Sequence, residues 1–199
     1  MKFICQLDYP HWLYITRTGH EGAEFEKGKT TTVKDSGCGM CGAVMMAHQL
    51  IPNCDFDLKA AIDLSYAVKG NQKKGTDYNI YGPALAEKLD LKYEQSKDIE
   101  DVLRCLRTGG SAICIAAGDR DGKLGIFCRG GHVMNVIGEE ADGRLVILDP
   151  SFRPDKYTET PERKEKVEVK YGYLVLSEKE TLARECAPKG TPYHLFWRK

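Results

Sequence analysis

The chain has 199 residues, which is enough for one domain with a substantial hydrophobic core. Its 29 Lys and Arg balance 29 Asp and Glu, so the formal net charge is zero and nothing favours nucleic acid or an anionic membrane as a partner. No run approaches the ~18 apolar residues that a membrane span needs, and the start, MKFICQLDYP, lacks the long apolar segment of a secretory signal. We therefore expect a single domain over residues 1–199 and a cytoplasmic protein.

The N-terminal half is predicted to be mainly helical. Residues 3–34 form an irregular leader that ends in KTTTVK, whose β-branched residues favour a short extended stretch. After a turn rich in glycine and cysteine, AVMMAHQLI (43–51) is apolar nearly all round and therefore predicts a buried helix, which Pro52 ends. Further helices are predicted at 57–70, at 82–91 with Pro83 in its first turn, and at 96–110 with Ser96 as its cap.

From residue 111 onward the pattern changes to strands. Five segments are β-branched or alternate in polarity: 111–118, 132–140, 143–149, 166–177 and 193–199. The charged stretch RPDKYTETPERKEK (153–166) is predicted to be a solvated surface loop, and SEKETLAREC (177–186) a short helix. Helices followed by a mostly antiparallel sheet predict an α+β fold rather than alternating βαβ units.

The eight cysteines are scattered along the chain. Several lie inside apolar runs, such as Cys114 in SAICIAAG, where a cysteine acts as a small buried hydrophobe. Because no export signal precedes them, a disulfide framework is not expected, and we predict that most are free thiols.

The segment DSGCGMCGAVMMAHQL (35–50) permits three interpretations. Its glycines form G-x-G-x-x-G, but a dinucleotide-binding turn needs a second parallel strand where this sequence predicts a helix. Cys38 and Cys41 form C-x-x-C, typical of a redox pair or half a zinc site, but neither a thioredoxin-like unit nor a second pair of zinc ligands is evident. Cys38 also precedes the predicted helix, where a thiol nucleophile would be activated.

A cysteine nucleophile needs a histidine and an orienting acid or amide elsewhere in the chain. His132 follows two glycines and opens a predicted strand, and Asp149 ends the next one. Two antiparallel strands joined by the turn between them would bring both side chains to one edge of the sheet. The other histidines are less suitable: His11 and His20 in the leader, His48 too far along the Cys38 helix, and His194 in the last strand.

Taken together, three motifs resemble those of the papain-like cysteine peptidases of the bacteriocin-processing (double-glycine leader peptidase) type. They are S-G-C-G at 36–39 before an apolar helix, G-G-H-V at 130–133 and L-D-P-S at 148–151. The stand-alone relatives that lack a transporter are the more similar, and the likeness extends from about Gln6 to Ser151. It implies a papain-like α+β fold, with the nucleophile at a helix N-terminus packed on the sheet. It also implies a peptide or protein substrate and no cofactor or metal.

Carried over to this sequence, the resemblance implies Cys38 as the nucleophile, His132 as the general base and Asp149 as its orienter. In papain the catalytic cysteine is the second of such a pair, which would point to Cys41. The bacteriocin-processing pattern instead has a cysteine directly followed by glycine, with methionine seven residues on. Cys38 and Met45 have that spacing, so Cys38 is favoured.

The sequence departs from the family pattern in two places. Met40 stands where proline or leucine is usual, and KTTTVKD lacks the glutamine that transporter-linked members contribute to the oxyanion hole. Gln6 is the predicted substitute, together with the backbone N–H of Cys38. Gly37 and Gly39 would let the substrate backbone approach the thiol.

Other functions stay open from the sequence. A papain-like shell can serve as a non-catalytic binding or regulatory module, and the C-x-x-C pair can serve a thiol redox protein. The same machinery can also act on isopeptide or other non-protein amide bonds.

Overall fold

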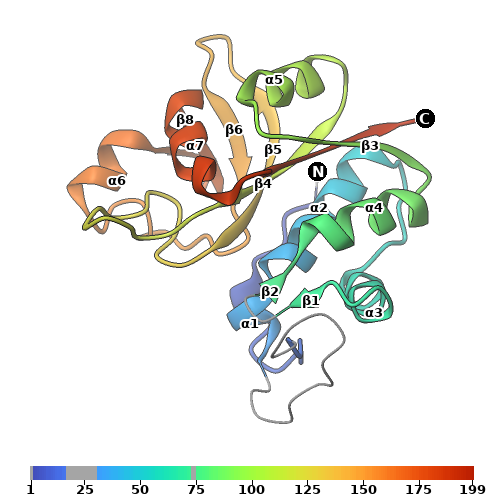
Figure 1. The fold of residues 1–199 in the computed structure, drawn as a ribbon. Helices are drawn as coiled ribbons and strands as arrows, with labels where there is room; N and C mark the ends of the chain where they lie inside the picture. The colour runs from blue at the N-terminus through green and yellow to red at the C-terminus, as the bar shows by residue number, and fades with distance from the viewer. Residues whose placement is uncertain (1, 17–30, 73–74) are drawn as a thin grey trace.

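The computed structural model describes residues 2–16, 31–72 and 75–199. Its N-terminal part is mainly helical, and a large antiparallel sheet forms most of the remainder (Figure 1). The N-terminal elements are the 3-10 helix η1 (Gln6–Asp8), α1 (Val33–Ser36), α2 (Cys38–Leu50), α3 (Leu58–Ala67), β1 (Asn71–Gln72), β2 (Gly75–Thr76) and α4 (Tyr78–Lys88). His20 and the first two residues of KTTTVK lie outside the described residues.

Seven strands form the main sheet in the order β3-β9-β4-β5-β6-β8-β7, and all neighbouring strands are antiparallel. The strands are β3 (Leu91–Ser96), β4 (Ser111–Ala116), β5 (His132–Glu139), β6 (Leu145–Leu148), β7 (Glu168–Lys170), β8 (Leu174–Ser177) and β9 (Tyr193–Arg198). The remaining helices are α5 (Ile99–Arg107), α6 (Pro161–Lys166), α7 (Lys179–Cys186) and the 3-10 helix η2 (Ala187–Lys189). The predicted α+β class is confirmed.

Both faces of the central strands are covered, which explains why these strands are almost continuously apolar. In β5, Val133 joins the core beneath α2, α3 and α4, whereas Met134 and Val136 join a second core beneath α5 and α7. Successive side chains of a strand point to opposite faces, so each face receives every second residue. Figure 1 shows the two groups of helices on opposite sides of the sheet.

Helix α2 lies in the first of these cores, and every residue from Gly39 to Ala47 is buried. Its contact with β5 is close because Gly42 has no side chain: an added Cβ would lie 3.0 Å from Oδ1 of Asn135. Asn135 Nδ2 donates a hydrogen bond of 2.9 Å to the carbonyl of Gly42 across this contact. The apolar helix and this hydrogen bond therefore hold the start of α2 against the start of β5.

Several predicted elements differ from the structure in kind or in boundary. The stretch from Val33 is one helical turn rather than extended, with Thr32 and Asp35 forming a capping box. Helix α4 begins before the predicted 82–91 because Asp77 caps it by accepting the N–H of Asn79, which places Pro83 inside the helix. The cap of α5 is Asp98 rather than Ser96.

The largest correction concerns residues 153–166, predicted to be a solvated loop. Lys156, Tyr157 and Arg163 in this segment are all buried, and its last residues form α6. Arg163 donates to the carbonyls of Gly125 and Lys156, so its guanidinium is satisfied inside the protein. The charged stretch is therefore folded onto the body of the protein, next to Asp149.

Candidate active site

Cys38 is the first residue of α2 and is partly exposed. The free N–H groups at a helix N-terminus carry partial positive charge, which favours an anion such as a thiolate. One turn along, Cys41 is fully buried, and burial raises the pKa of its thiol well above the ordinary value. The helix therefore presents one accessible sulfur, that of Cys38, and packs the other in the core.

His132 and Asp149 lie beside Cys38 at the ends of two paired strands. His132 opens β5, and Asp149 follows β6, whose Leu148 is paired with Asn135 of β5. Nε2 of His132 is 2.6 Å from Oδ1 of Asp149, and the ring lines the same cleft as the Cys38 thiol, with which it interacts. The structure thus brings Cys38 together with two residues that follow it by 94 and 111 positions in the sequence.

Asp149 is completely buried and accepts hydrogen bonds on both carboxylate oxygens. Oδ1 accepts hydrogen bonds from the His132 ring and from the backbone N–H of Ser151, the latter at 2.8 Å. Oδ2 accepts hydrogen bonds from Nζ of Lys156 at 2.5 Å and from the hydroxyl of Tyr157 at 2.7 Å. A buried carboxylate is costly unless it is paired and hydrogen-bonded, and here both conditions are met.

Lys156 and Tyr157 were not predicted from the sequence as neighbours of Asp149. Both are buried, with Lys156 only 4 % exposed and Tyr157 only 1 % exposed. The one signal available was an aromatic residue within an otherwise charged stretch, close after the L-D-P-S motif. Charge density alone suggested a solvated segment, because the pairing that permits burial of Lys156 involves a residue outside that segment.

The environment shifts the pKa of each of these groups. Burial would raise the pKa of Cys38, but its hydrogen bond to His132, the charge of that ring and two backbone N–H groups lower it overall. Burial would lower the pKa of His132, but the charge of Asp149 and hydrogen bonds to Asp149 and Cys38 raise it overall. Burial would raise the pKa of Asp149, but Lys156 and His132 hold it far below its usual range. These directions favour a thiolate, an imidazolium and a carboxylate.

Gln6 lies close to the loop that contains Asp149, but its side-chain amide is already engaged. Its backbone N–H donates to the carbonyl of Pro150 at 2.7 Å, and its Nε2 donates to the carbonyl of Lys34 at 2.6 Å. Its Oε1 is buried and lacks a hydrogen-bond partner in the described structure. Because Nε2 has two N–H bonds, one remains for another acceptor. Gln6 is not among the residues that line the cleft beside Cys38.

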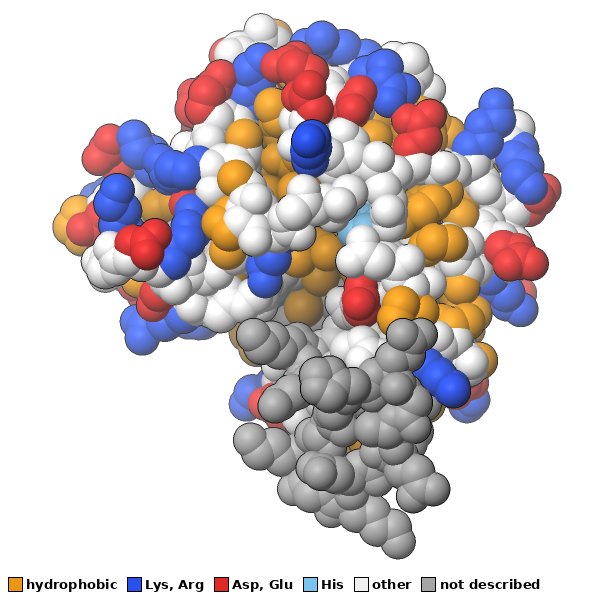
Figure 2. Space-filling model, in the orientation of Figure 1, with side chains coloured by type: hydrophobic (Ala, Val, Ile, Leu, Met, Phe, Trp, Pro, Cys, Tyr) orange, Lys and Arg blue, Asp and Glu red, His pale blue; other side chains and the backbone are white. Residues whose placement is uncertain are grey.

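A cleft of about 490 Å³ opens beside Cys38, between the N-terminal helices and the sheet. Its helical side is formed by Cys38, Gln72, Gly75, Thr76, Asp77, Tyr78 and Asn79, and its sheet side by Ile115, Gly131, His132, Val133, Lys189 and Thr191. In Figure 2 the surface is hollowed between these two parts, and charges of both signs are interspersed around it. The Cys38 thiol therefore borders an open cleft.

The two glycines next to Cys38 do not have the predicted role. A Cβ on Gly39 would lie 2.5 Å from Oγ1 of Thr76, and a Cβ on Gly37 would lie 2.5 Å from Cγ1 of Val33. The space beside each glycine is therefore filled by the protein itself, not left for a substrate. The absence of a side chain at Gly39 lets β2 approach the start of α2 and form a wall of the cleft.

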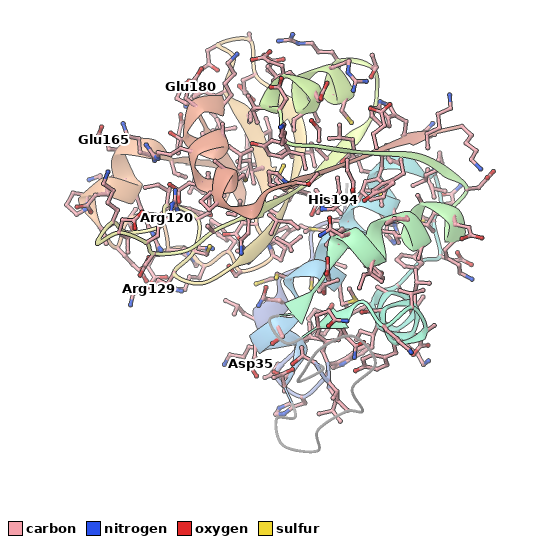
Figure 3. All side chains as sticks on the ribbon, in the orientation of Figure 1. Asp35, Arg120, Arg129, Glu165, Glu180 and His194 are labelled. Atoms are coloured by element: carbon pink, nitrogen blue, oxygen red, sulfur yellow. The ribbon has the colours of Figure 1, made fainter. Side chains whose placement is uncertain are left out.

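The histidines outside the cleft have other surroundings. His194 is buried in β9, where its Nδ1 is 2.7 Å from the hydroxyl of Tyr93, and burial lowers its pKa to about 4 (Figure 3). His48 lies in the last turn of α2, far from Cys38, and His11 is exposed. His132 is therefore the histidine that the fold brings to Cys38 among those described.

No protein-family model matches the chain, and no curated protein matches it by sequence. Among solved structures it is similar to a crystal structure from Bacillus anthracis described as a "putative C39-like peptidase". The two share 13 % sequence identity with a TM-score of 0.60, over 100 % of this chain and 94 % of the other. The chain has a papain-like fold. At this level of identity the similarity establishes the fold and nothing finer.

The papain-like fold accounts for the arrangement of the site, with the start of one helix and the ends of two interior strands meeting at a cleft. Among residues 2–16, 31–72 and 75–199, no group of three or more His, Cys, Asp or Glu side chains is placed to hold a metal ion. In the same part of the chain, no helix combines the length and the apolar character that a membrane crossing requires.

Proposed function

We propose that the protein is a cysteine peptidase in which Cys38 is the nucleophile, His132 the general base and Asp149 the residue that orients His132. The observation that carries this proposal is the placement of the partly exposed Cys38, at a helix N-terminus, in one cleft with His132, whose ring is hydrogen-bonded to the buried Asp149. A nucleophile, a base and an orienting group in this arrangement are what acyl transfer to a thiol requires. The papain-like fold supports the same conclusion.

In the proposed reaction the Cys38 thiolate attacks the carbonyl carbon of the scissile bond, and a tetrahedral oxyanion forms. The backbone N–H of Cys38 and the second N–H of Gln6 Nε2 are the proposed donors to this oxyanion. His132 then transfers its proton to the leaving amine, which departs and leaves an acyl-thiol. His132 next takes a proton from water, which attacks the acyl carbon. The carbon–sulfur bond then breaks, the acyl group leaves as a carboxylic acid, and the Cys38 thiolate and the His132 imidazolium are restored.

The proposed substrate is a peptide or protein chain that lies extended in the cleft. Cleavage after a double-glycine leader is the specificity that the resemblance of the motifs implies. Thiol redox exchange through Cys38 and Cys41 is the weaker proposal, because Cys41 is fully buried and the pKa of its thiol is raised. A resolving thiol needs both access and thiolate character.

Selective alkylation tests the nucleophile. An ordinary cysteine has a pKa near 8.5, so at pH ~6 a thiolate-forming Cys38 should react with iodoacetamide much faster than other partly exposed thiols. Cys54, which is also partly exposed, is the internal reference, and peptide mapping by mass spectrometry reads both sites. His132→Ala should abolish the difference. Equal rates at Cys38 and Cys54 in the unmodified chain would exclude an activated nucleophile.

Substrate profiling tests the reaction itself. A peptide library that includes Gly-Gly sequences should be cleaved by the unmodified chain and not by Cys38→Ala. Cys41→Ala is the matched control and should retain cleavage if its thiol serves only the core. A reactive Cys38 without cleavage of any peptide would contradict the peptide assignment and direct the search to isopeptide or other amide bonds.

A further inference from the structure

Lys156 is a cation in the interior of the protein, which is rare because an ammonium loses its hydration there. Its Nζ lies 2.5 Å from Oδ2 of Asp149 and 2.7 Å from Oγ of Ser151. The same nitrogen lies 5.3 Å from the centre of the Tyr157 ring. These contacts all belong to the segment that begins at Asp149, and the charge of Lys156 is compensated there by the Asp149 carboxylate.

The two oxygens of Asp149 have separate functions in this arrangement. Oδ1 faces the ring of His132, and Oδ2 faces the ammonium of Lys156. Ser151 Oγ lies between the two cationic groups, 2.7 Å from Nζ of Lys156 and 3.1 Å from Nε2 of His132. His132 therefore faces a carboxylate that is already paired with a positive charge a few ångströms away.

We propose that Lys156 is a positioning residue that neutralises Asp149, so that His132 is oriented by an ion pair without net charge. This inference rests on the proposed function and adds a residue to its machinery. A bare buried carboxylate would stabilise the imidazolium strongly and make His132 a poor donor to the leaving amine. When Lys156 is paired with Oδ2, Oδ1 of Asp149 still orients the His132 ring. The positive charge of Lys156 offsets the carboxylate charge that would otherwise hold the proton on His132.

Other charges near His132 differ from Lys156 in position or exposure. Several titratable and charged groups surround His132 or line the cleft: Cys38, Asp77 and Tyr78 on the helical side, Cys128 before β5, Asp149, Lys156 and Tyr157 after β6, and Lys189 of η2. Lys189 is exposed, so solvent screens its charge. Lys156 is buried against Asp149, where screening is weak, so its removal should have the larger effect on His132.

The titration of His132 tests this inference without any substrate. NMR signals of the imidazole C–H groups are followed against pH, and the His132 signal is assigned by its absence from His132→Gln. In Lys156→Met, the unpaired Asp149 should raise the titration midpoint of His132 by about 1 pH unit. Lys164→Met removes an exposed lysine of α6 and is the matched control, with no change expected. An unchanged midpoint in Lys156→Met would overturn the inference.

If Lys156→Met fails to fold, a second pair of variants tests whether the charge of Lys156 affects the titration of His132. Asp149→Asn leaves the Lys156 ammonium beside a neutral amide, so the His132 midpoint should fall below that of the unmodified chain. Adding Lys156→Met to Asp149→Asn removes that charge, so the midpoint should rise again, and thermal stability should rise with it. A double variant with the same midpoint as Asp149→Asn alone would also overturn the inference.

These readouts separate the inference from the proposed function. The midpoint reports the charge next to His132 whether or not any peptide is cleaved. If the chain is an active peptidase and the His132 midpoint does not change in Lys156→Met, only the proposed role of Lys156 is refuted. A chain whose midpoint moves as expected, but whose Cys38 reacts no faster than Cys54, refutes the proposed function and leaves the Asp149–Lys156 pair intact.

Discussion

Removal of the Tyr157 hydroxyl measures how much one of the buried hydrogen bonds to Asp149 contributes to the stability of the fold. The hydroxyl donates to Oδ2 of Asp149 at 2.7 Å, and Tyr157→Phe removes it while keeping the ring between Phe127 and Phe152. A hydrogen bond to a charged group contributes about 1.5–3 kcal/mol. Lys156 still pairs with the same oxygen, so we expect the free energy of unfolding to fall by about 2 kcal/mol. For a chain of this size the Tm should then fall by ~4–8 °C.

Urea unfolding followed by circular dichroism at pH 7 and pH 5 measures this loss. Tyr171→Phe is the matched control, because Tyr171 is 83 % exposed and its hydroxyl faces solvent. The pKa of Asp149 is held far below its usual range, so the acceptor stays charged at both pH values and the loss should be equal. The reasoning is refuted if Tyr157→Phe costs no more than Tyr171→Phe, or if its cost disappears at pH 5.

Three further outcomes follow from the structure. Gly39→Ala places a Cβ 2.5 Å from Oγ1 of Thr76, so unfolding free energy should fall by about 1–3 kcal/mol and recover in part when Thr76→Gly is added. The pKa of His132 is raised, so its imidazolium stabilises the fold below about pH 6.5, and this contribution is lost as the pH rises through the folded value. The stability difference between the unmodified chain and His132→Gln should therefore shrink from pH 5 to pH 9, and a constant difference would contradict the shift. Gln6→Ala should lower kcat by roughly 100-fold or more if its amide binds the oxyanion. A loss of Tm with kcat unchanged would assign Gln6 to holding Lys34 alone.

Local patterns in the sequence were sufficient for the elements that carry Cys38 and His132. The apolar run 43–51 predicts a buried helix, and the β-branched run 132–140 predicts a strand, because burial on all sides or on both faces leaves a direct mark on composition. β3 was missed because only Leu91 of its six residues is buried, so its sequence has no apolar alternation. It lies at the edge of the sheet, where packing constrains the sequence least.

The wrong predictions within the site also arose because a local sequence pattern does not show which segments pack together. Residues 153–166 are rich in charged side chains, and a highly charged segment is ordinarily exposed to solvent. Lys156 is buried because Asp149 and Ser151 compensate it, and Arg163 is buried because it reaches the carbonyl of Gly125. Such compensation depends on which segments meet in space. The predicted role of Gly39 failed for a similar reason, because its neighbour Thr76 comes from a distant strand.

The sequence by itself determined the class of fold and the placement of Cys38 at a helix start, and it predicted that His132 and Asp149 lie near each other at the ends of two strands. It could do so because helix and strand periodicity, helix ends and the order of short motifs are local properties of the chain. Only the tertiary structure decided that the Gln6 amide is engaged by Lys34 and that Lys156 and Tyr157 surround Asp149. Those facts depend on burial and charge compensation between segments, and such relations exist only once the chain has folded.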